Sequence, residues 1–301
     1  MNVLTLQHVV KAYHSHIAVN DVSFDVKAGT IFGLLGPNGA GKTSLIRIIT
    51  TITGADSGQI LLNGEPLNSM HPNEIGYMPE ERGLYKKMKV GEQLVYLARL
   101  KGLSQHDAKT KLMAWMKKFD IVSWWNKPVG DLSKGMSQKI QFIATIIHDP
   151  KLIILDEPFS GLDPINANLI KDEIYHLKEQ GTSILFSTHR MEQVEEICED
   201  IVLMNKGKVI LSGNVKQIKN DFKEHLFSIK YQGKLPDNID TLGYEITTHA
   251  NNEIIMKGSQ GEKSNHLIKA LIDSNVSIMS FNEILPTLNE IFIKKVELSN
   301  E

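Results

Sequence analysis

The segment Gly36-Pro-Asn-Gly-Ala-Gly41-Lys42-Thr43 restricts the fold of this chain more than any other part of its sequence. It has the spacing G-x-x-x-x-G-K-[ST], follows the apolar run Ile31–Leu35 directly and precedes a helical run from Ser44 to Ile52. Glycines let the backbone wind so that several N–H groups point at phosphate oxygens near the positive end of a helix. A glycine-rich turn without a ligand is the alternative, but it does not account for this order of strand, loop and helix. The segment therefore predicts a phosphate-binding loop.

Two side chains of this loop have predicted roles of their own. Lys42 is expected to reach the β- and γ-phosphates and to act in catalysis, and the Thr43 hydroxyl is expected to ligate Mg²⁺. The loop residues expected to bind the nucleotide are Gly36, Pro37, Asn38, Gly39, Ala40, Gly41, Lys42, Thr43 and Ser44.

A pair of carboxylates follows a second apolar run. Leu152–Leu155 predicts a buried strand, and Asp156 and Glu157 come directly after it, at the strand end where ligands of open α/β sheets bind. Asp156 is expected to hold Mg²⁺, and Glu157 to orient and deprotonate the attacking water. A solvated turn is the alternative. It does not explain why the pair follows an apolar strand in a chain that also has a phosphate-binding loop.

Charge and cysteine content exclude several classes of protein. Lysine plus arginine number 33 and aspartate plus glutamate 35, a formal charge of −2, so there is no electrostatic case for a dedicated nucleic-acid binder. The single Cys198 excludes an internal disulfide framework and indicates a reducing compartment. We expect Cys198 to fill space in the core.

No segment is predicted to span or cross a membrane. The most apolar stretch, from Ile140 to Leu155, is interrupted by polar residues before it reaches the ~18 apolar residues that a spanning helix needs. The first residues lack the basic and apolar regions of a signal peptide. We therefore expect a soluble cytosolic protein.

Two regions with different sequence patterns predict two domains. Residues 1–215 alternate short apolar runs, glycine-rich turns and helical stretches, which predicts an α/β sheet covered by helices. A helical subdomain is expected at about 86–135, with 90–129 its most helical part. Residues 216–301 predict a small α+β domain. Further candidate strands of the first domain are Ser183–Phe186 and Ile201–Met204.

The smaller domain has fewer signals. Strands are expected at 226–231, 254–256 and 276–281, and a helix at 262–272. A last helix is predicted with Pro286 in its first turn and Leu288, Ile291, Phe292 and Val296 on one face. We find no catalytic or metal-binding grouping in this domain, and its role stays open between regulation, dimerisation and support of the larger domain.

In this order, the motifs resemble the nucleotide-binding subunits of ATP-binding-cassette (ABC) proteins, over residues 1 to about 215. Leu132-Ser133-Lys134-Gly135-Met136 looks like the family's L-S-G-G-Q signature, with Lys and Met at its third and fifth positions. The resemblance implies that Ser133 and Gly135 contact the γ-phosphate of ATP held by the opposite subunit. It therefore implies that two copies sandwich two ATP molecules. A serine N-cap without a ligand is the alternative for Ser133.

Other matches fall where the family places them. Phe159–Asp163 resembles the loop that links the two sites across the dimer, and His189 resembles the switch histidine that contacts the γ-phosphate. Tyr13 matches the aromatic residue that stacks on adenine. The resemblance thus implies an ABC cassette fold of the P-loop NTPase class, with a mixed, mainly parallel sheet.

The chain departs from the family pattern at one position. Glu80 stands where the family usually has a glutamine that touches both Mg²⁺ and the membrane partner. A carboxylate can accept a hydrogen bond from a metal-bound water, but it adds charge and cannot donate. Two readings stay open at equal weight, a Glu80 that contacts the metal and a Glu80 that is solvated or paired with Arg82.

The loop Pro79–Gly83, the altered signature and Leu285–Ile293 narrow the resemblance to bacterial exporters described as sodium-export-type ATP-binding proteins. This subgroup implies an ATPase peripheral to the inner face of the cell membrane, with the permease on a separate chain that contacts the helical insert and the loop Glu80–Tyr85. Trp115, Trp124 and Trp125 either form part of that contact or pack the insert, and we favour packing.

Two other functions fit the sequence less well. A soluble ABC ATPase acting on ribosomes or DNA would usually carry two cassettes or long coiled coils, whereas about 90 residues without sustained heptads separate Lys42 from Leu132. A GTP-specific switch would need an Asn-Lys-x-Asp motif, which Asn205–Lys208 does not supply. We therefore expect an ATPase that energises transport.

Overall fold

The computed structural model describes residues 1–81, 83–235, 244–250, 252–258 and 264–298. The chain forms two compact units, Met1–Val215 and Lys216–Glu301. Each unit has a hydrophobic core of its own. None of the described helices is long and apolar enough to cross a lipid bilayer.

A six-stranded sheet forms the centre of the first unit. Its order is β10-β9-β3-β8-β7-β6, and every neighbouring pair is parallel except β10 with β9. Every residue of β3, β7 and β8 is buried, as expected for central strands of a sheet that is covered on both faces. The strands are β3 (Ile31–Leu35), β6 (Ile75–Met78), β7 (Leu152–Asp156), β8 (Ser183–Thr188), β9 (Asp200–Asn205) and β10 (Lys208–Asn214).

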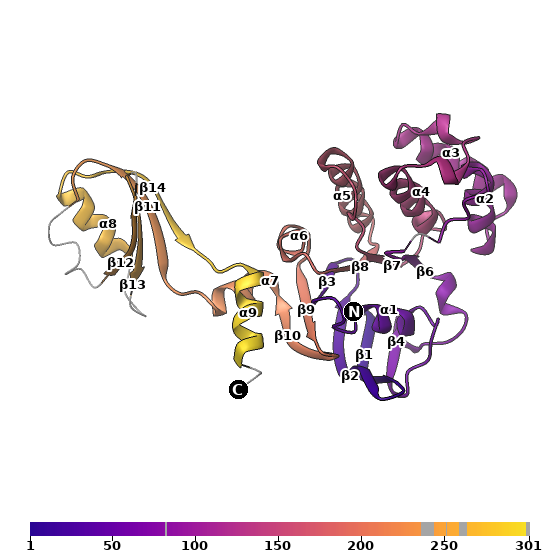
Figure 1. The fold of residues 1–301 in the computed structure, drawn as a ribbon, viewed down its shortest axis with the longest axis horizontal. Helices are drawn as coiled ribbons and strands as arrows, with labels where there is room; N and C mark the ends of the chain where they lie inside the picture. Colours follow the sequence, from indigo (N-terminus) through magenta and orange to yellow (C-terminus); the bar gives the residue numbers. More distant parts are fainter. Residues whose placement is uncertain (82, 236–243, 251, 259–263, 299–301) are drawn as a thin grey trace. The chain divides into compact units, whose positions relative to one another are not determined.

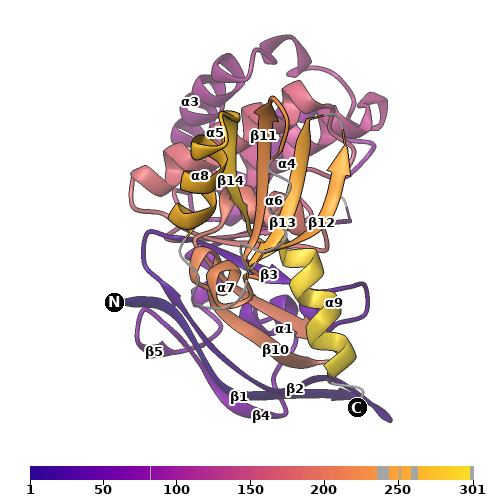
Figure 2. The ribbon, with the colours of Figure 1, turned by 90° about the vertical axis from the view of Figure 1, so that its left-hand side faces the viewer.

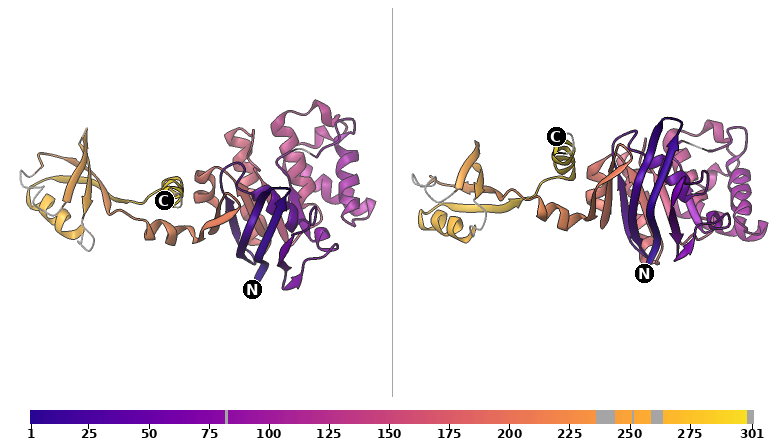
Figure 3. Two further views of the ribbon diagram at one scale, coloured as in Figure 1. Left: turned by 60° about the horizontal axis from the view of Figure 1, so that its bottom comes forward. Right: turned by 90° about the horizontal axis from the view of Figure 1, so that it is seen from below.

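Both faces of this sheet are covered. On one side lie α1 (Lys42–Ile49) and a second, antiparallel sheet in the order β2-β1-β4-β5 (Figure 1). Leu45, Ile46 and Ile49 of α1 pack into one core with both sheets. The strands of the second sheet, of which Figure 3 shows β1 and β2 as a long pair, are β1 (Asn2–Tyr13), β2 (His16–Lys27), β4 (Ser57–Leu62) and β5 (Glu65–Pro66).

Helices cover the other face of the six-stranded sheet. Figure 1 shows α4, α5 and α6 on this side, and Figure 2 shows α3, α4 and α5 opposite the antiparallel strands from a second direction. Asp163 begins α5 as its N-cap, because its carboxylate accepts a hydrogen bond from the Asn166 backbone N–H at 2.9 Å. The bounds are α4 (Lys134–Ile146), α5 (Pro164–Glu179) and α6 (Met191–Ile197).

The stretch expected to be helical contains α2 (Val90–Leu100) and α3 (Gln105–Lys118), followed by short 3₁₀ turns at Val122–Trp124 and Val129–Asp131. Its tryptophans pack within it. The ring of Trp115 lies 6.0 Å from that of Phe119, and the Trp125 indole lies directly against Gly91. Packing, the role we favoured, therefore accounts for both residues.

The second unit is an antiparallel sheet with helices. The sheet has the order β12-β13-β11-β14, and α8 packs Leu267 and Leu271 into the core that the sheet forms. α7 runs across the boundary between the two units. The elements are α7 (Val215–Asp221), β11 (Leu226–Gln232), β12 (Tyr244–Ala250), β13 (Glu253–Gly258), α8 (Ser264–Asp273), β14 (Ser277–Ile284) and α9 (Leu288–Leu298).

Several elements differ from the sequence predictions, and the following differences are the clearest. The first helix spans Lys42–Ile49 rather than 44–52, because Thr50 is its C-cap and Thr51 has a left-handed backbone with a φ angle of +57°. Pro286 precedes α9 instead of lying in its first turn. Thr287 is the N-cap, and its hydroxyl accepts a hydrogen bond from the Glu290 N–H at 3.2 Å.

Two further comparisons concern β12 and α8 of the second unit. Strand β12 was not predicted, because Tyr244–Ala250 carries threonine, histidine and glutamate rather than a clean apolar alternation. Of the helix expected at 262–272, residues 262 and 263 lie outside the described residues, and α8 begins at Ser264.

Candidate active site

Glycines shape the loop between β3 and α1. Gly36 and Gly41 have φ angles of +151° and +103°. A Cβ atom on Gly36 would lie 2.4 Å from the carbonyl oxygen of Met204, and one on Gly41 would lie 2.2 Å from that of Ala18. Because both neighbours are backbone atoms, only glycine fits at these two positions. Gly41 is also the N-cap of α1 and caps it with no side chain, so the first N–H groups of the helix can serve an anion.

Lys42 is held by the loop that it follows. Its ammonium group donates to the carbonyl oxygens of Gly36 at 2.6 Å and Pro37 at 3.2 Å. Burial lowers the pKa of Lys42, and the nearby carboxylates of Glu157, Asp156 and Glu80 oppose that shift. The lysine is thus a buried cation with three acidic neighbours.

A cavity of about 410 Å³ lies over this loop. Its size falls within the usual range of small-molecule sites. Tyr13 of the β1–β2 hairpin and Glu80, from the segment after β6, line it together with the carboxylate pair that ends β7. The lining residues are Tyr13, His16, Ala18, Asn38, Gly39, Ala40, Gly41, Lys42, Thr43, Ser44, Glu80, Asp156 and Glu157.

The carboxylate of Glu157 is fixed from two sides by the end of β8. Its Oε1 accepts the His189 backbone N–H at 2.8 Å and lies 2.6 Å from His189 Nδ1. Its Oε2 accepts the Thr188 hydroxyl at 3.0 Å. The fold thus brings together Glu157 and His189, which are 32 residues apart in the sequence.

Asp156 is buried beside Glu157 at the end of β7. Its Oδ1 accepts the Ser187 hydroxyl at 2.7 Å. Burial raises the pKa of Asp156, the Ser187 hydrogen bond and Lys42 lower it, and the carboxylates of Glu157 and Glu80 raise it further.

The oxygen donors of this cavity suit Mg²⁺ if phosphate oxygens complete the set. Among the described residues, no three histidine, cysteine, aspartate or glutamate side chains come together to hold a metal ion. Asp156, Glu80 and the exposed Thr43 hydroxyl line one cavity with the phosphate-binding loop. Proteins usually hold Mg²⁺ through one or two carboxylates plus substrate phosphates, which is the arrangement available here. Arg82, the alternative partner of Glu80, lies outside the described residues.

Ser133 and Gly135 are not among the residues that line this cavity. They lie at the start of α4, where the exposed Ser133 accepts the Met136 N–H through its hydroxyl at 3.2 Å and is the N-cap of the helix. Gly36 and Pro37 do not line the cavity either. Their carbonyl groups accept hydrogen bonds from Lys42. His189 reaches the site through Glu157 alone.

The predicted site residues do not include several residues of this region, among them Ser187, whose hydroxyl donates to Asp156. His16 and Ala18 line the cavity from β2. Because residues two apart on a strand point to the same face, the two side chains could have been predicted together, close after Tyr13 in the sequence. The Thr188 hydroxyl donates to the Glu157 carboxylate, and the Gln138 amide donates to the Pro158 carbonyl. A glutamine among the apolar residues of α4 was the available signal for Gln138.

Comparison with protein families agrees with this site. Residues 19–160 match the family model described as "ABC transporter", and residues 213–296 match the "ATP-binding protein DrrA1-3-like, C-terminal domain". The first match covers the phosphate-binding loop, the altered signature and the carboxylate pair.

Individual proteins match over longer stretches. The uncharacterized ABC transporter ATP-binding protein YhaQ of Bacillus subtilis is 43% identical over 97% of this chain and 98% of its own length. The ABC transporter ATP-binding protein NatA of the same organism is 35% identical over 72% of this chain and 90% of its own. A solved structure titled "Structure of ATP binding subunit of ABC transporter" is 30% identical, with a TM-score of 0.68 over 73% of this chain and 93% of that one. The predicted fold class, a cassette with a mixed sheet plus a small C-terminal domain, is confirmed.

Proposed function

The chain belongs to the ATP-binding proteins of ABC transporters, which are ATPases, and from that premise we propose that two copies hydrolyse Mg-ATP in shared sites to drive an exporter. The observation that carries the hydrolytic role is the convergence of Lys42, Asp156, Glu157 and Glu80 on one cavity above the glycine loop. Asp156 and Glu157 lie more than a hundred residues after Lys42 in the sequence, so this convergence is a property of the fold.

In the proposed reaction each residue has one task. Glu157, oriented by Thr188 and His189, accepts the proton of the attacking water. Lys42 stabilises the negative charge that develops on the transferring phosphoryl group. We assign His189 to contact with the γ-phosphate, and its Nδ1, 2.6 Å from Glu157 Oε1, supports a position beside the reacting water. Tyr13 offers an aromatic face to the base. Thr43 and Asp156, with Glu80 nearby, would hold Mg²⁺, which would supply further charge neutralisation when bound.

The proposal of a shared site rests on the position of Ser133 and Gly135. Both lie at the N-terminal end of α4, away from the cavity of their own chain. The start of a helix with a serine N-cap and no acidic residue in its first turn suits a phosphate group. We assign these residues to the ATP of a second copy of this chain, as the family resemblance implies.

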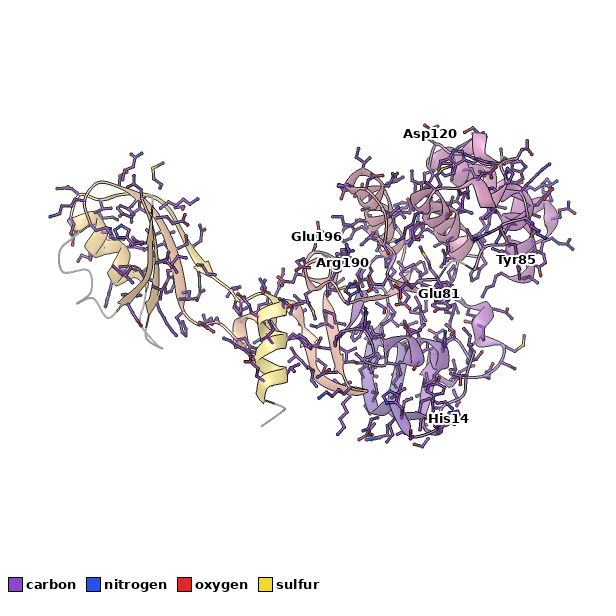
Figure 4. All side chains as sticks on the ribbon, viewed as in Figure 1. His14, Glu81, Tyr85, Asp120, Arg190 and Glu196 are labelled. Carbon is purple, nitrogen blue, oxygen red and sulfur yellow. The ribbon has the colours of Figure 1, made fainter. Side chains whose placement is uncertain are left out.

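We assign the membrane partner to a permease on a separate chain. Neighbouring exposed apolar residues on or beside α2 support this assignment, since contiguous exposed apolar patches often mark interfaces. Tyr85, which Figure 4 labels, forms an edge-to-face pair with Tyr96 at a ring-centre distance of 6.4 Å. Leu100 is exposed one helical turn beyond Tyr96. The protein would then lie at the inner face of the cell membrane and bind no nucleic acid.

The second candidate is an ABC-type ATPase with a non-membrane partner. It shares every residue of the hydrolytic site, so the two candidates differ in their partner alone. Pull-down from detergent-solubilised membranes with the ATP-bound protein decides between them. Recovery of an integral membrane protein supports the transporter, and recovery of ribosomes or DNA supports the alternative.

The first experiment tests the shared site and Glu157 together. Light scattering after size exclusion on Glu157→Gln should show a monomer without nucleotide and a dimer with Mg-ATP. The amide keeps the size of the side chain but cannot accept the proton, so we expect hydrolysis to fall by a factor on the order of 10³ or more while ATP still binds.

Lys42→Ala is the control for nucleotide binding. It should lose ATP affinity itself, because the buried cation that faces the phosphates is gone. A Glu157→Gln protein that binds ATP but stays monomeric at high protein concentration would contradict the proposal that two copies alone complete the site.

A further inference from the structure

Glu157 has an unusual backbone conformation. Its φ angle is +51°, in the left-handed region that residues with a side chain rarely adopt. Such a conformation is unfavourable by itself and persists only where surrounding contacts hold it. The Glu157 N–H donates to the Ser187 carbonyl at 2.9 Å, which fixes one side of this turn.

A glutamine of α4 holds the other side. Gln138 is 2% exposed, and its Nε2 donates to the carbonyl oxygen of Pro158 at 2.8 Å and lies 3.4 Å from that of Glu157. One side-chain amide thus reaches both carbonyl groups of the turn that carries the carboxylate. A buried hydrogen bond of this kind fixes geometry, because losing it leaves a buried carbonyl without its partner.

We propose that Gln138 is a positioning residue for hydrolysis, which holds the Glu157 turn against α4 so that the carboxylate faces the cavity. This inference rests on the proposed role of Glu157. Gln138 is not among the residues that line the cavity. It therefore acts through Glu157 and has no direct contact with the nucleotide.

A second contact extends the connection along the same helix. Lys134 lies four residues before Gln138, so both side chains are on one face of α4. The Lys134 ammonium donates to the Ser160 hydroxyl at 3.1 Å, and its methylene groups lie directly over Gly161. The start of α4, which we assign to the ATP site of a second copy, is thereby joined to the turn that carries Glu157 in its own chain. Movement of α4 in one site would then reposition the carboxylate of the other.

The test compares two glutamines of α4 in the full-length protein. Gln138→Met keeps the length of the side chain and removes its donor. We expect kcat for ATP hydrolysis to fall on the order of 10- to 100-fold, the cost of a small misplacement of a reacting group, with the Kd for ATP unchanged. The matched control is Gln141→Met. Gln141 is also buried on α4, but its amide donates to the Pro79 carbonyl at 2.8 Å and makes no contact with the Glu157 turn.

Two further measurements separate positioning from a general loss of structure. In single-turnover assays, Gln138→Met should have no additional effect in a Glu157→Gln background, because its effect passes through that carboxylate. Gln138→Glu should be impaired at about pH 8 and recover relative to wild type towards about pH 6, since a buried carboxyl group facing carbonyl oxygens is protonated easily and then donates.

The outcomes are distinguishable. A Gln138→Met protein with wild-type kcat would overturn the inference, as would equal losses in Gln138→Met and Gln141→Met or an undiminished effect in the Glu157→Gln background. If Glu157→Gln itself hydrolyses ATP at the wild-type rate, the proposed role of Glu157 fails instead.

Discussion

His148, which follows α4, is a residue whose charge is controlled by its surroundings. Its Nε2 lies 3.3 Å from the Ile75 carbonyl, and its buried Nδ1 has no hydrogen-bond partner among the described residues. The pKa of His148 is lowered from 6.5 to about 4, first by burial and then by the positive charges of Lys101 and Lys111, while the Ile75 carbonyl and Asp149 oppose the shift. Protonation would place a buried N–H on Nδ1 without an acceptor.

A pH dependence of stability follows from this depressed pKa. The unfolded chain takes up the proton near pH 6.5 and the folded chain only near pH 4, so the unfolded state binds more protons between them. Stability is then complete above pH 6.5 and falls as pH decreases towards 4. For a partly exposed ring we expect a loss of about 1–2 kcal/mol.

The measurement is urea denaturation of wild type and His148→Gln across that pH range. The glutamine keeps a donor for the Ile75 carbonyl and does not titrate there. Its stability should therefore decrease less with acid than that of the wild type. Parallel curves for the two proteins would show that His148 is not the group responsible.

The helical insert is held together by close contact between α2 and the segment after α3. A Cβ atom added to Gly91, in the first turn of α2, would lie 2.3–2.7 Å from three atoms of the Trp125 indole. The Gly91 N–H also donates to the Trp125 carbonyl at 2.9 Å. Because position 91 has no side chain, the indole can lie directly against the helix.

Gly91→Ala should destabilise the insert, although alanine normally favours a helix over glycine by about 1 kcal/mol. The added methyl group must displace the indole, and overpacking of this kind costs about 1–3 kcal/mol. All three tryptophans of the chain lie in or beside the insert, so the change is measurable as denaturant unfolding followed by tryptophan fluorescence.

A double variant provides the control. Gly91→Ala combined with Trp125→Ala removes the side chain that the new methyl group strikes, so alanine should no longer be worse than glycine at position 91. If Gly91→Ala raises the unfolding midpoint in the wild-type background, the proposed packing conflict is wrong.

The whole molecule consists of two units with separate hydrophobic cores. The core of the second unit is built from nine buried residues of its sheet, of α8 and of the residue before β14, among them Ile229, Ile254 and Leu271. The described residues that line the cavity over the phosphate-binding loop all belong to the first unit. A ligand raises the free energy of unfolding only of the unit that binds it, so ATP should stabilise the first unit and not the second.

Scanning calorimetry of the whole chain tests this separation. With Mg-ATP at about 100 times its Kd, the transition of the first unit should gain about 2.7 kcal/mol while that of the second stays in place. Ile229→Ala should lower the second transition, because removing a fully buried side chain costs about 2–5 kcal/mol, and leave the Kd for ATP unchanged. A single transition that moves as a whole under both changes would show that the units unfold together.

Much of the first unit was predictable because its signals are local. The apolar runs at β3, β7, β8 and β9 are each a strand of the central sheet, within two residues of the expected ends. Buried parallel strands read as short, nearly continuous apolar runs, which is a pattern visible without tertiary information. β12 was missed because its sequence mixes polar and apolar residues and becomes a strand by pairing with β13.

The sequence by itself determined the phosphate-binding loop, the order of motifs and the residues that carry the proposed chemistry. It did so because glycine, lysine and carboxylate positions are constrained over a few neighbouring residues. Only the tertiary structure decided that Gln138 donates to the turn that carries Glu157, that His16 and Ala18 line the cavity, and that His148 is half-buried near two lysines. These properties depend on contacts between segments far apart in the chain, for which no local pattern exists.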